Sequence, residues 1–210
     1  LLVISPPRDA QIYIRHNLPL WESYIQQCWN VCVTYPHNIL SVSPFCWMYN
    51  HAMSILSGKH IILGVTGSIA AYKAADLASK LTQAGAQVDV ILTSAAEKFI
   101  TPLTFQSVTG RRAYTEQDLW GNEAHVLHVN IGHTADLLVI APCTANTLAK
   151  LAYGMADNLL TVTALAATCP LVVVPAMDGG MYDHPATQEN LDTLRKRGAY
   201  IIEPDEGHLA

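Results

Sequence analysis

The fold is decided by the stretch Gly64-Val65-Thr66-Gly67-Ser68-Ile69-Ala70-Ala71-Tyr72-Lys73. An apolar run precedes it, and an amphipathic pattern follows it as far as Gly85. This order predicts a strand, a turn of small residues and a helix. Small residues let the backbone approach a ligand closely, and a helix start offers free N–H groups and the positive end of its dipole. We therefore predict an anion site, most often a phosphate site, although the stretch is neither a GxGxxG fingerprint nor a P-loop.

Strand and helix patterns alternate along the chain after residue 59. Strands that are separated by helices form a parallel sheet with helices on both faces. We therefore predict an α/β fold with a three-layer parallel sheet of the Rossmann-like or flavodoxin-like kind. The predicted strands are 61–65, 88–92, 137–141, 171–174 and 200–202, and the predicted helices are 69–84, 95–100, 102–109, 144–151, 158–167 and 185–197.

Small and hydroxyl residues follow four of the predicted strands. Ligands of open parallel sheets bind beyond the carboxyl ends of the strands, so these turns are expected to meet in one crevice. The turns are Gly67-Ser68-Ile69, Thr93-Ser94, Pro142-Cys143-Thr144-Ala145-Asn146 and Pro175-Ala176-Met177-Asp178.

Composition excludes several classes of function. The 210 residues carry a net charge of -5, whereas nucleic-acid binders are usually basic. Five cysteines at irregular spacing argue against a disulfide framework or a zinc site, so we expect a reducing, cytoplasmic environment and no metal. The uncharged stretch 159–177 is long enough for a membrane span, but Pro170 interrupts it and it reads better as a helix, a turn and a buried strand.

Residues 1–52 differ from the rest of the chain. They hold three of the four tryptophans, three of the five cysteines and no lysine, and no helical or strand period persists. Our hypothesis is that Met53 is the natural start and that 1–52 is upstream translation or a poorly structured extension. A small partner-binding arm is the alternative. The regular domain is then 53–210.

Three segments together resemble the flavin-containing cysteine decarboxylases, the family that includes phosphopantothenoylcysteine decarboxylase. The resemblance covers about residues 58–210. The segments are Gly64–Lys73, His128-Val129-Asn130-Ile131 through Thr144-Ala145-Asn146-Thr147-Leu148-Ala149-Lys150, and Pro175-Ala176-Met177-Asp178-Gly179-Gly180-Met181-Tyr182 with the His184–Leu191 stretch after it. Residues 203–210 are similar to the bifunctional version, in which a phosphopantothenate–cysteine ligase domain follows, so the decarboxylase domain is expected to be truncated at its C-terminal end.

The resemblance implies an FMN cofactor and assigns roles to the motif residues. The FMN phosphate would lie on Gly67, Ser68 and Ile69. Ser94 and the turn Thr144, Ala145, Asn146 and Thr147 would contact the phosphate, the ribityl chain or the ring edge. His128 matches the family's essential histidine, and Ala176, Asp178 and Met181 would face the substrate. Asn146 could also cap the helix that follows it, which is compatible with a ligand contact.

The resemblance also implies the chemistry. The substrate would be 4′-phosphopantothenoylcysteine, and the product would be 4′-phosphopantetheine for coenzyme A biosynthesis. A plain cysteine carboxylate loses carbon dioxide slowly, because the carbanion has no electron sink. Oxidation of the thiol to a thioaldehyde by FMN supplies that sink, and the reduced flavin then returns the electrons. A histidine titrates near neutrality and suits acid–base work or substrate orientation.

Two departures from the family pattern matter. Asp178 stands where asparagine is common, and an ionised carboxylate accepts hydrogen bonds but cannot donate to a substrate carboxylate. Many relatives carry a cysteine in a flap that would lie beyond Ala210, so we expect FMN binding and substrate oxidation but poor completion of turnover.

Other functions fit parts of the pattern. The alternatives are a peptide cysteine decarboxylase, an enzyme like the flavin prenyltransferases, or a non-catalytic FMN-binding regulatory subunit. The resemblance further implies a homotrimer or a dodecamer of trimers with FMN near a subunit interface, and no nucleic-acid or membrane partner.

Overall fold

The computed structural model describes residues 56–120 and 124–204, and the prediction for 1–52 lies outside them. The strands are β1 (His60–Val65), β2 (Gln87–Leu92), β3 (Ala113–Tyr114), β4 (Leu137–Cys143), β5 (Leu171–Pro175) and β6 (Tyr200–Ile201). The α-helices are α3 (Ala71–Gln83), α4 (Pro102–Thr109), α5 (Ala124–Thr134), α6 (Ala145–Tyr153), α7 (Leu159–Ala166), α8 (Gly179–Tyr182) and α9 (Pro185–Lys196). Two short 3₁₀ turns are η2 (Ala96–Lys98) and η3 (Glu116–Trp120).

All six strands form one parallel sheet in the order β3-β2-β1-β4-β5-β6. Ile61 pairs with Val88 of β2 on one side and with Leu137 of β4 on the other. This is the strand order of the Rossmann fold, and the order reverses between β1 and β4. The predicted α/β fold is confirmed, and the reversal puts a crevice beyond the carboxyl ends of β1 and β4.

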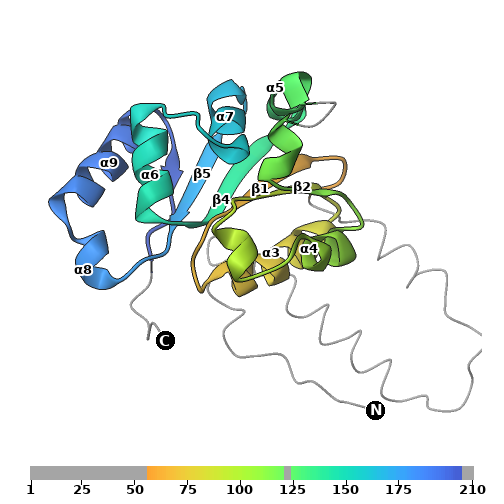
Figure 1. The fold of residues 1–210 in the computed structure, drawn as a ribbon, viewed down its shortest axis with the longest axis horizontal. Helices are drawn as coiled ribbons and strands as arrows, with labels where there is room; N and C mark the ends of the chain where they lie inside the picture. Colours follow the sequence, from red (N-terminus) through yellow and green to blue (C-terminus); the bar gives the residue numbers. More distant parts are fainter. Residues whose placement is uncertain (1–55, 121–123, 205–210) are drawn as a thin grey trace, which may run out of the picture. The chain divides into compact units, whose positions relative to one another are not determined.

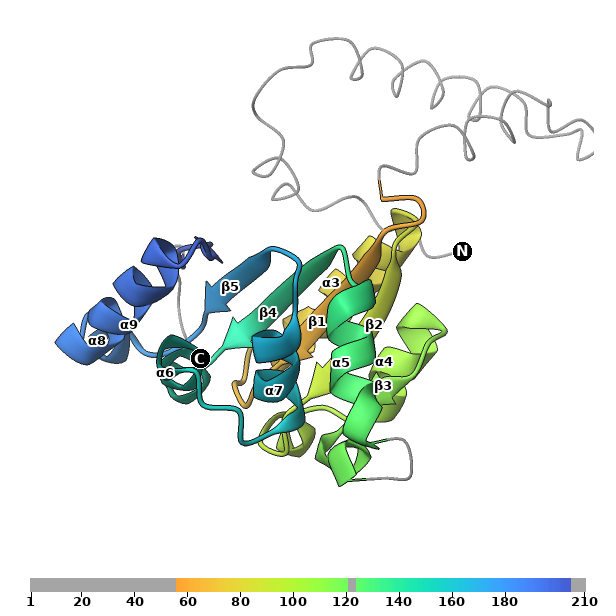
Figure 2. The same ribbon diagram turned by 90° about the horizontal axis from the view of Figure 1, so that it is seen from above.

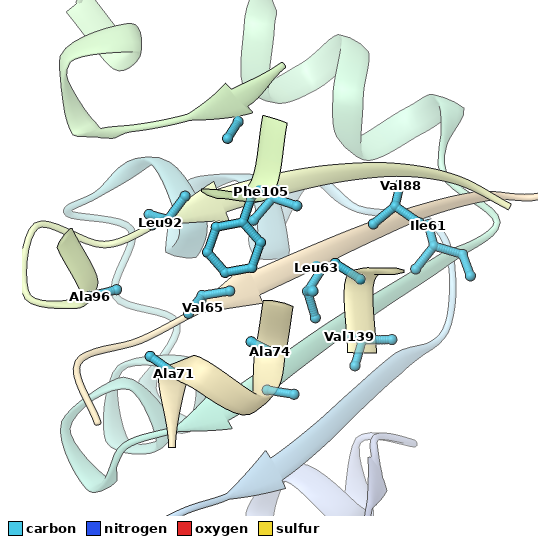
Figure 3. Close-up of a cluster of buried hydrophobic side chains, with 14 of the residues drawn as sticks. Ile61, Leu63, Val65, Ala71, Ala74, Val88, Leu92, Ala96, Phe105 and Val139 are labelled. Carbon is cyan, nitrogen blue, oxygen red and sulfur yellow. The ribbon is translucent and has the colours of Figure 1, made fainter. Parts of the chain in front are cut away.

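Helices cover both faces of the sheet (Figure 1, Figure 2). Figure 1 shows α3 and α4 on one side and α5 and α7 on the other. On the first side, Phe105 of α4 is fully buried against Leu63, Val65 and Leu92 of the sheet (Figure 3). Residues of α5, α6, α7 and α9 share a second buried cluster with the other face of the sheet. Because strand side chains alternate between faces, Ile61 and Leu63 join the first cluster and Ile62 joins the second.

Several local signals act as the sequence predicts. Pro102 begins α4 after Thr101, and Gly110 ends it with a φ of +65°, a conformation that favours glycine.

The helix after β1 is shorter than the predicted 69–84. It begins at Ala71, because the Ser68 carbonyl accepts from the Ala71 N–H and closes a turn first. The predicted helix 95–100 is only the turn η2.

The long uncharged stretch 159–177 divides as predicted. It contains α7, a connection and β5. Asn158 begins α7 with a capping box, in which its side chain accepts from the Thr161 N–H and the Thr161 side chain accepts from the Asn158 N–H. Within the described part of the chain, no helix is long and apolar enough to cross a membrane.

One buried charge ties the first three strands together. The Asp89 side chain in β2 is 6% exposed, and it accepts from Nε and Nη2 of Arg111 at 2.7 and 2.9 Å. Its Oδ2 also lies 2.7 Å from Nε2 of His60 at the start of β1. A buried carboxylate needs such partners, and Arg111 lies just before the short edge strand β3. The Arg111 contact therefore helps to fix β3 at the edge of the sheet.

Candidate functional site

A pocket of about 400 Å³ lies beyond the carboxyl ends of β1, β2 and β4. Turns from these three neighbouring strands meet there, together with one residue from α8. The lining residues are Gly67, Thr93, Ser94, Ala95, Thr144, Ala145, Asn146, Thr147, Lys150, Asn158 and Met181. Residues of three of the four predicted turns line this pocket, whereas none of the turn 175–178 does; Met181 of α8, which follows that turn, lines it.

Thr66 joins the turn after β1 to the turn after β4. Its hydroxyl donates to the Pro142 carbonyl at 2.7 Å and accepts from the Thr144 N–H at 3.0 Å. Thr66 is only 1% exposed, so both bonds are shielded from water. This residue holds two pocket walls together, and sequence reasoning missed that role.

Gly67 lets the turn after β1 lie against the turn after β2. A Cβ at position 67 would stand 2.5 Å from the Ala95 Cβ and 3.1 Å from the Ala95 carbonyl carbon. Both neighbours are fixed to the backbone and cannot rotate away. Glycine is therefore required at this position for the close approach of two backbones.

Backbone donors face this region without acceptors. Within the described residues, the N–H groups of Gly67, Ser94 and Ala95 donate to no protein atom. Thr144 caps α6, and its hydroxyl accepts from the Thr147 N–H at 3.4 Å. The suggestion that Asn146 caps this helix is thus wrong: Thr144 has the extended backbone that a cap needs, and Asn146 lies inside the helix and lines the pocket.

The three residues predicted to face the substrate lie in α8 or just before it. Met181 is 51% exposed and lines the pocket, but Asp178 and Ala176 do not. Asp178 is exposed and caps α8, and its Oδ2 accepts from the Gly180 N–H at 2.9 Å. The Ala176 N–H donates to the Cys143 carbonyl at 3.0 Å, which anchors the start of this loop to β4.

His128 lies in α5, outside the lining of this pocket. Its ring is partly buried, and Nδ1 has no hydrogen-bond partner among the described residues. Ser68 and Ile69 also stand outside the lining. The Ser68 hydroxyl accepts from the Ala70 N–H at 3.3 Å, and Ile69 is 56% exposed. Of the predicted site residues, the pocket lining includes Gly67, Ser94, Thr144, Ala145, Asn146, Thr147 and Met181, and it does not include Ser68, Ile69, His128, Ala176 or Asp178.

Lys150 and Asn158 line the pocket although neither was assigned a role from the sequence. Lys150 follows Asn146 by four residues on α6, so helical spacing could have found it. Its ammonium binds Asp157 at 2.7 Å, and that hydrogen bond lowers the pKa of the Asp157 carboxyl. Glu116 of η3 accepts from the Leu159 N–H at the start of α7, while burial raises the pKa of its carboxyl.

The cysteines that the structure describes contribute no reactive thiol to this region. Burial raises the pKa of the Cys143 thiol, which is fully enclosed beneath the turn after β4. A larger pocket of about 530 Å³ lies between α6, α7 and α9 and holds Cys169, but none of the predicted site residues line it.

Comparison with known proteins identifies the family of this chain. The model of the family described as Flavoprotein matches residues 50–210. The coenzyme A biosynthesis bifunctional protein CoaBC of Bacillus subtilis is 47% identical over 156 residues, which cover 74% of this chain and 38% of that protein. The protein of the same name from Mycobacterium tuberculosis H37Rv is 46% identical over 151 residues, 72% of this chain and 36% of that protein. The chain thus spans less than two fifths of these relatives.

Solved structures share the fold. The FMN-dependent cysteine decarboxylase SpaF has a TM-score of 0.66 at 39% identity, over 72% of this chain and 87% of that chain. A mutant PPC decarboxylase complexed with pantothenoylaminoethenethiol has a TM-score of 0.65 at 34% identity, over 72% and 85%. Family model, sequence relatives and structures coincide on the same fold, and the chain belongs to the flavoprotein family.

Proposed function

We propose that this chain is the FMN-dependent decarboxylase part of a coenzyme A biosynthetic protein, and that it acts on 4′-phosphopantothenoylcysteine. The observation that carries the proposal is the pocket at the strand-order reversal, whose glycine turn and unpaired N–H groups suit a phosphate. The 47% identity to a bifunctional coenzyme A protein supports this substrate over others.

The residues present fit FMN. The close approach at Gly67 leaves the backbone bare of side chains, as a phosphate cradle requires. Thr93, Ser94 and Thr144 line the same pocket, and the exposed hydroxyl residue Ser94 suits the ribityl chain. Gly67, Ser94 and the 144–147 turn would hold the cofactor.

FMN, when bound, supplies the two-electron oxidation of the substrate thiol that makes carbon dioxide loss feasible, and it returns the electrons afterwards. The protein binds and orients the cofactor and the substrate. Met181 of α8 lines the pocket and would exclude water from the substrate side. His128 has an unpartnered Nδ1 among the described residues and would exchange a proton with the substrate or orient it.

The proposal includes a homo-oligomer, a trimer or a dodecamer of trimers. His128 lies outside the pocket lining of its own chain, so a neighbouring subunit would bring it to the cofactor. Large exposed apolar side chains support burial by a second copy, since Ile69 and Tyr72 are 56% and 63% exposed and Trp120 is 86% exposed. We also propose a ligase domain in the full-length protein and a cytoplasmic location.

A peptide cysteine decarboxylase is the second candidate. SpaF, named as an FMN-dependent cysteine decarboxylase, is 39% identical to this chain, against 34% for the PPC decarboxylase structure. Both candidates share the cofactor and the oxidation step. They differ in the group attached to the reacting cysteine, which is a phosphopantothenoyl group in one substrate and a peptide in the other.

Two measurements test the proposal. The absorbance spectrum of the purified chain should show bound oxidised flavin. Mixing it anaerobically with 4′-phosphopantothenoylcysteine should bleach that absorbance and release carbon dioxide, whereas His128→Asn should bind FMN without bleaching. A peptide with a C-terminal cysteine serves as the competing substrate.

The outcomes separate the candidates. Bleaching by the peptide alone would transfer the assignment to peptide decarboxylation. Flavin binding with neither reaction, in a full-length form as well, would reject the enzyme and leave a regulatory FMN-binding subunit.

A further inference from the structure

Lys150 is the charged side chain of the candidate pocket. The other lining residues that the structure describes are uncharged. Lys150 stands on α6 three and four residues after Thr147 and Asn146, on the face that those two pocket residues share. Its side chain is only 19% exposed, which is low for a lysine. A mostly buried cation in a ligand pocket needs a counter-anion.

Within the protein, Lys150 pairs with Asp157, and this ion pair is easily broken. Its Nζ lies 2.7 Å from Oδ2 of Asp157, whose side chain is 50% exposed. The other oxygen, Oδ1, accepts from Asn158 Nδ2 at 3.3 Å and from Thr161 Oγ1 at 3.5 Å. Water can solvate a half-exposed carboxylate if the ammonium turns away, and exposed ion pairs contribute little free energy. Lys150 can therefore change partners at low cost.

A bound flavin mononucleotide would offer a stronger partner. In oxidised FMN the ring and the ribityl chain are neutral, so the phosphate is the group that carries charge. The unpaired N–H groups of Gly67, Ser94 and Ala95 supply dipoles to an anion but no full positive charge. A dianion taken out of water is costly without a counter-charge.

We propose that Lys150 supplies the positive charge that holds the phosphate of the bound nucleotide, and that Asp157 competes with that phosphate for the same ammonium. The inference rests on the proposed FMN site. It makes Lys150 a binding residue and makes Asp157 a negative regulator of affinity.

A purely structural role for the pair predicts something else. The Lys150–Asp157 bond joins α6 to the connection before α7, and Asn158 of that connection lines the pocket. If the bond only held this wall, loss of either partner would loosen the pocket and weaken every ligand. Competition instead predicts opposite effects from the two residues, and it predicts that they depend on the phosphate.

The test compares FMN with riboflavin, which lacks the phosphate. Dissociation constants come from quenching of flavin fluorescence at fixed ionic strength, for the parent chain, Lys150→Met, Lys150→Arg and Asp157→Asn. The amide oxygen introduced by Asp157→Asn can still accept from Asn158 and Thr161, so this change removes the charge and keeps those bonds. Lys80→Met is the matched control, because Lys80 pairs with Asp76 on the exposed side of α3. Circular dichroism checks that each variant is folded.

We expect Lys150→Met to weaken FMN by about tenfold and riboflavin by less than about twofold, as for a lost charge-assisted bond. Lys150→Arg should recover most of the loss, Asp157→Asn should bind FMN more tightly than the parent, and Lys80→Met should match the parent. Equal weakening of both ligands by Lys150→Met, or weaker FMN binding by Asp157→Asn, would overturn the inference. A parent chain that binds no flavin would instead reject the proposed function itself.

Discussion

Replacing Gly67 with alanine tests how tightly the turns after β1 and β2 must pack. The added Cβ would stand 2.5 Å from the Ala95 Cβ, whereas carbon atoms in contact prefer about 3.5 Å, so the two turns must separate by about 1 Å. Neither carbon can rotate away, and the Ala95 carbonyl carbon at 3.1 Å blocks a sideways shift. Overpacking of this kind costs about 1–3 kcal/mol. At this chain length that lowers the melting temperature by roughly 2–12 °C.

The same shift moves the N–H groups of Gly67 and Ala95 apart. We expect FMN affinity to fall by about tenfold, the value of one charge-assisted hydrogen bond. Urea unfolding followed by circular dichroism gives the stability change, and fluorescence quenching gives the affinity. Gly179→Ala is the control, because a Cβ there meets nothing within 4 Å. An unchanged unfolding midpoint for Gly67→Ala would show that the turns do not need glycine for close packing.

Three further predictions concern charged groups. Asp89→Ala should lower the free energy of unfolding, measured by urea titration, by about 3 kcal/mol. This value is at the low end for a broken buried ion pair because the Arg111 side chain is 38% exposed, and a loss under about 1 kcal/mol would contradict the role of this carboxylate. Burial raises the pKa of Glu116, so this carboxyl favours the folded state at low pH and loses that contribution as the pH rises through its folded pKa. Glu116→Gln keeps the acceptor for Leu159, so its melting temperature should rise relative to the parent between pH 4 and pH 7, by roughly 1 °C or less because the group is partly solvated. A fall relative to the parent over that range would refute the sign. Asp178→Asn should change the free energy of unfolding by less than about 0.5 kcal/mol, because an amide oxygen can still cap α8. The same change should lower the KM if the carboxylate of the substrate meets this residue, whereas a higher KM would mean that Asp178 accepts a hydrogen bond from a substrate N–H.

The second, larger pocket illustrates why size does not identify a site. It has a volume of about 530 Å³ and is lined by residues of α6, α7 and α9, with none from the turns after β1 and β2. Lys150 lines both pockets, but the glycine turn and the unpaired N–H donors line the smaller pocket at the reversal of strand order. Those groups, and not its volume, suit a phosphate.

Local sequence predicts β1, β2, β4, β5 and β6 and the helices α3, α4, α6, α7 and α9, but not α5, α8 or β3. Apolar runs such as Leu137–Cys143 form strands, and Thr101-Pro102 and Gly110 mark the ends of α4, because periodicity and capping depend on neighbours along the chain. Alternation of strands and helices then suffices for a parallel three-layer fold with its ligand turns at one edge.

Tertiary structure decides what depends on distant partners. β3 has two residues and no pattern of its own, and it is fixed by pairing with β2 and by the Arg111–Asp89 contact. The same holds for the pocket: helical spacing carries Lys150 into it, while His128 stays outside on α5. A residue's type reveals what chemistry it can perform, but which groups meet depends on packing between segments that are far apart in the sequence.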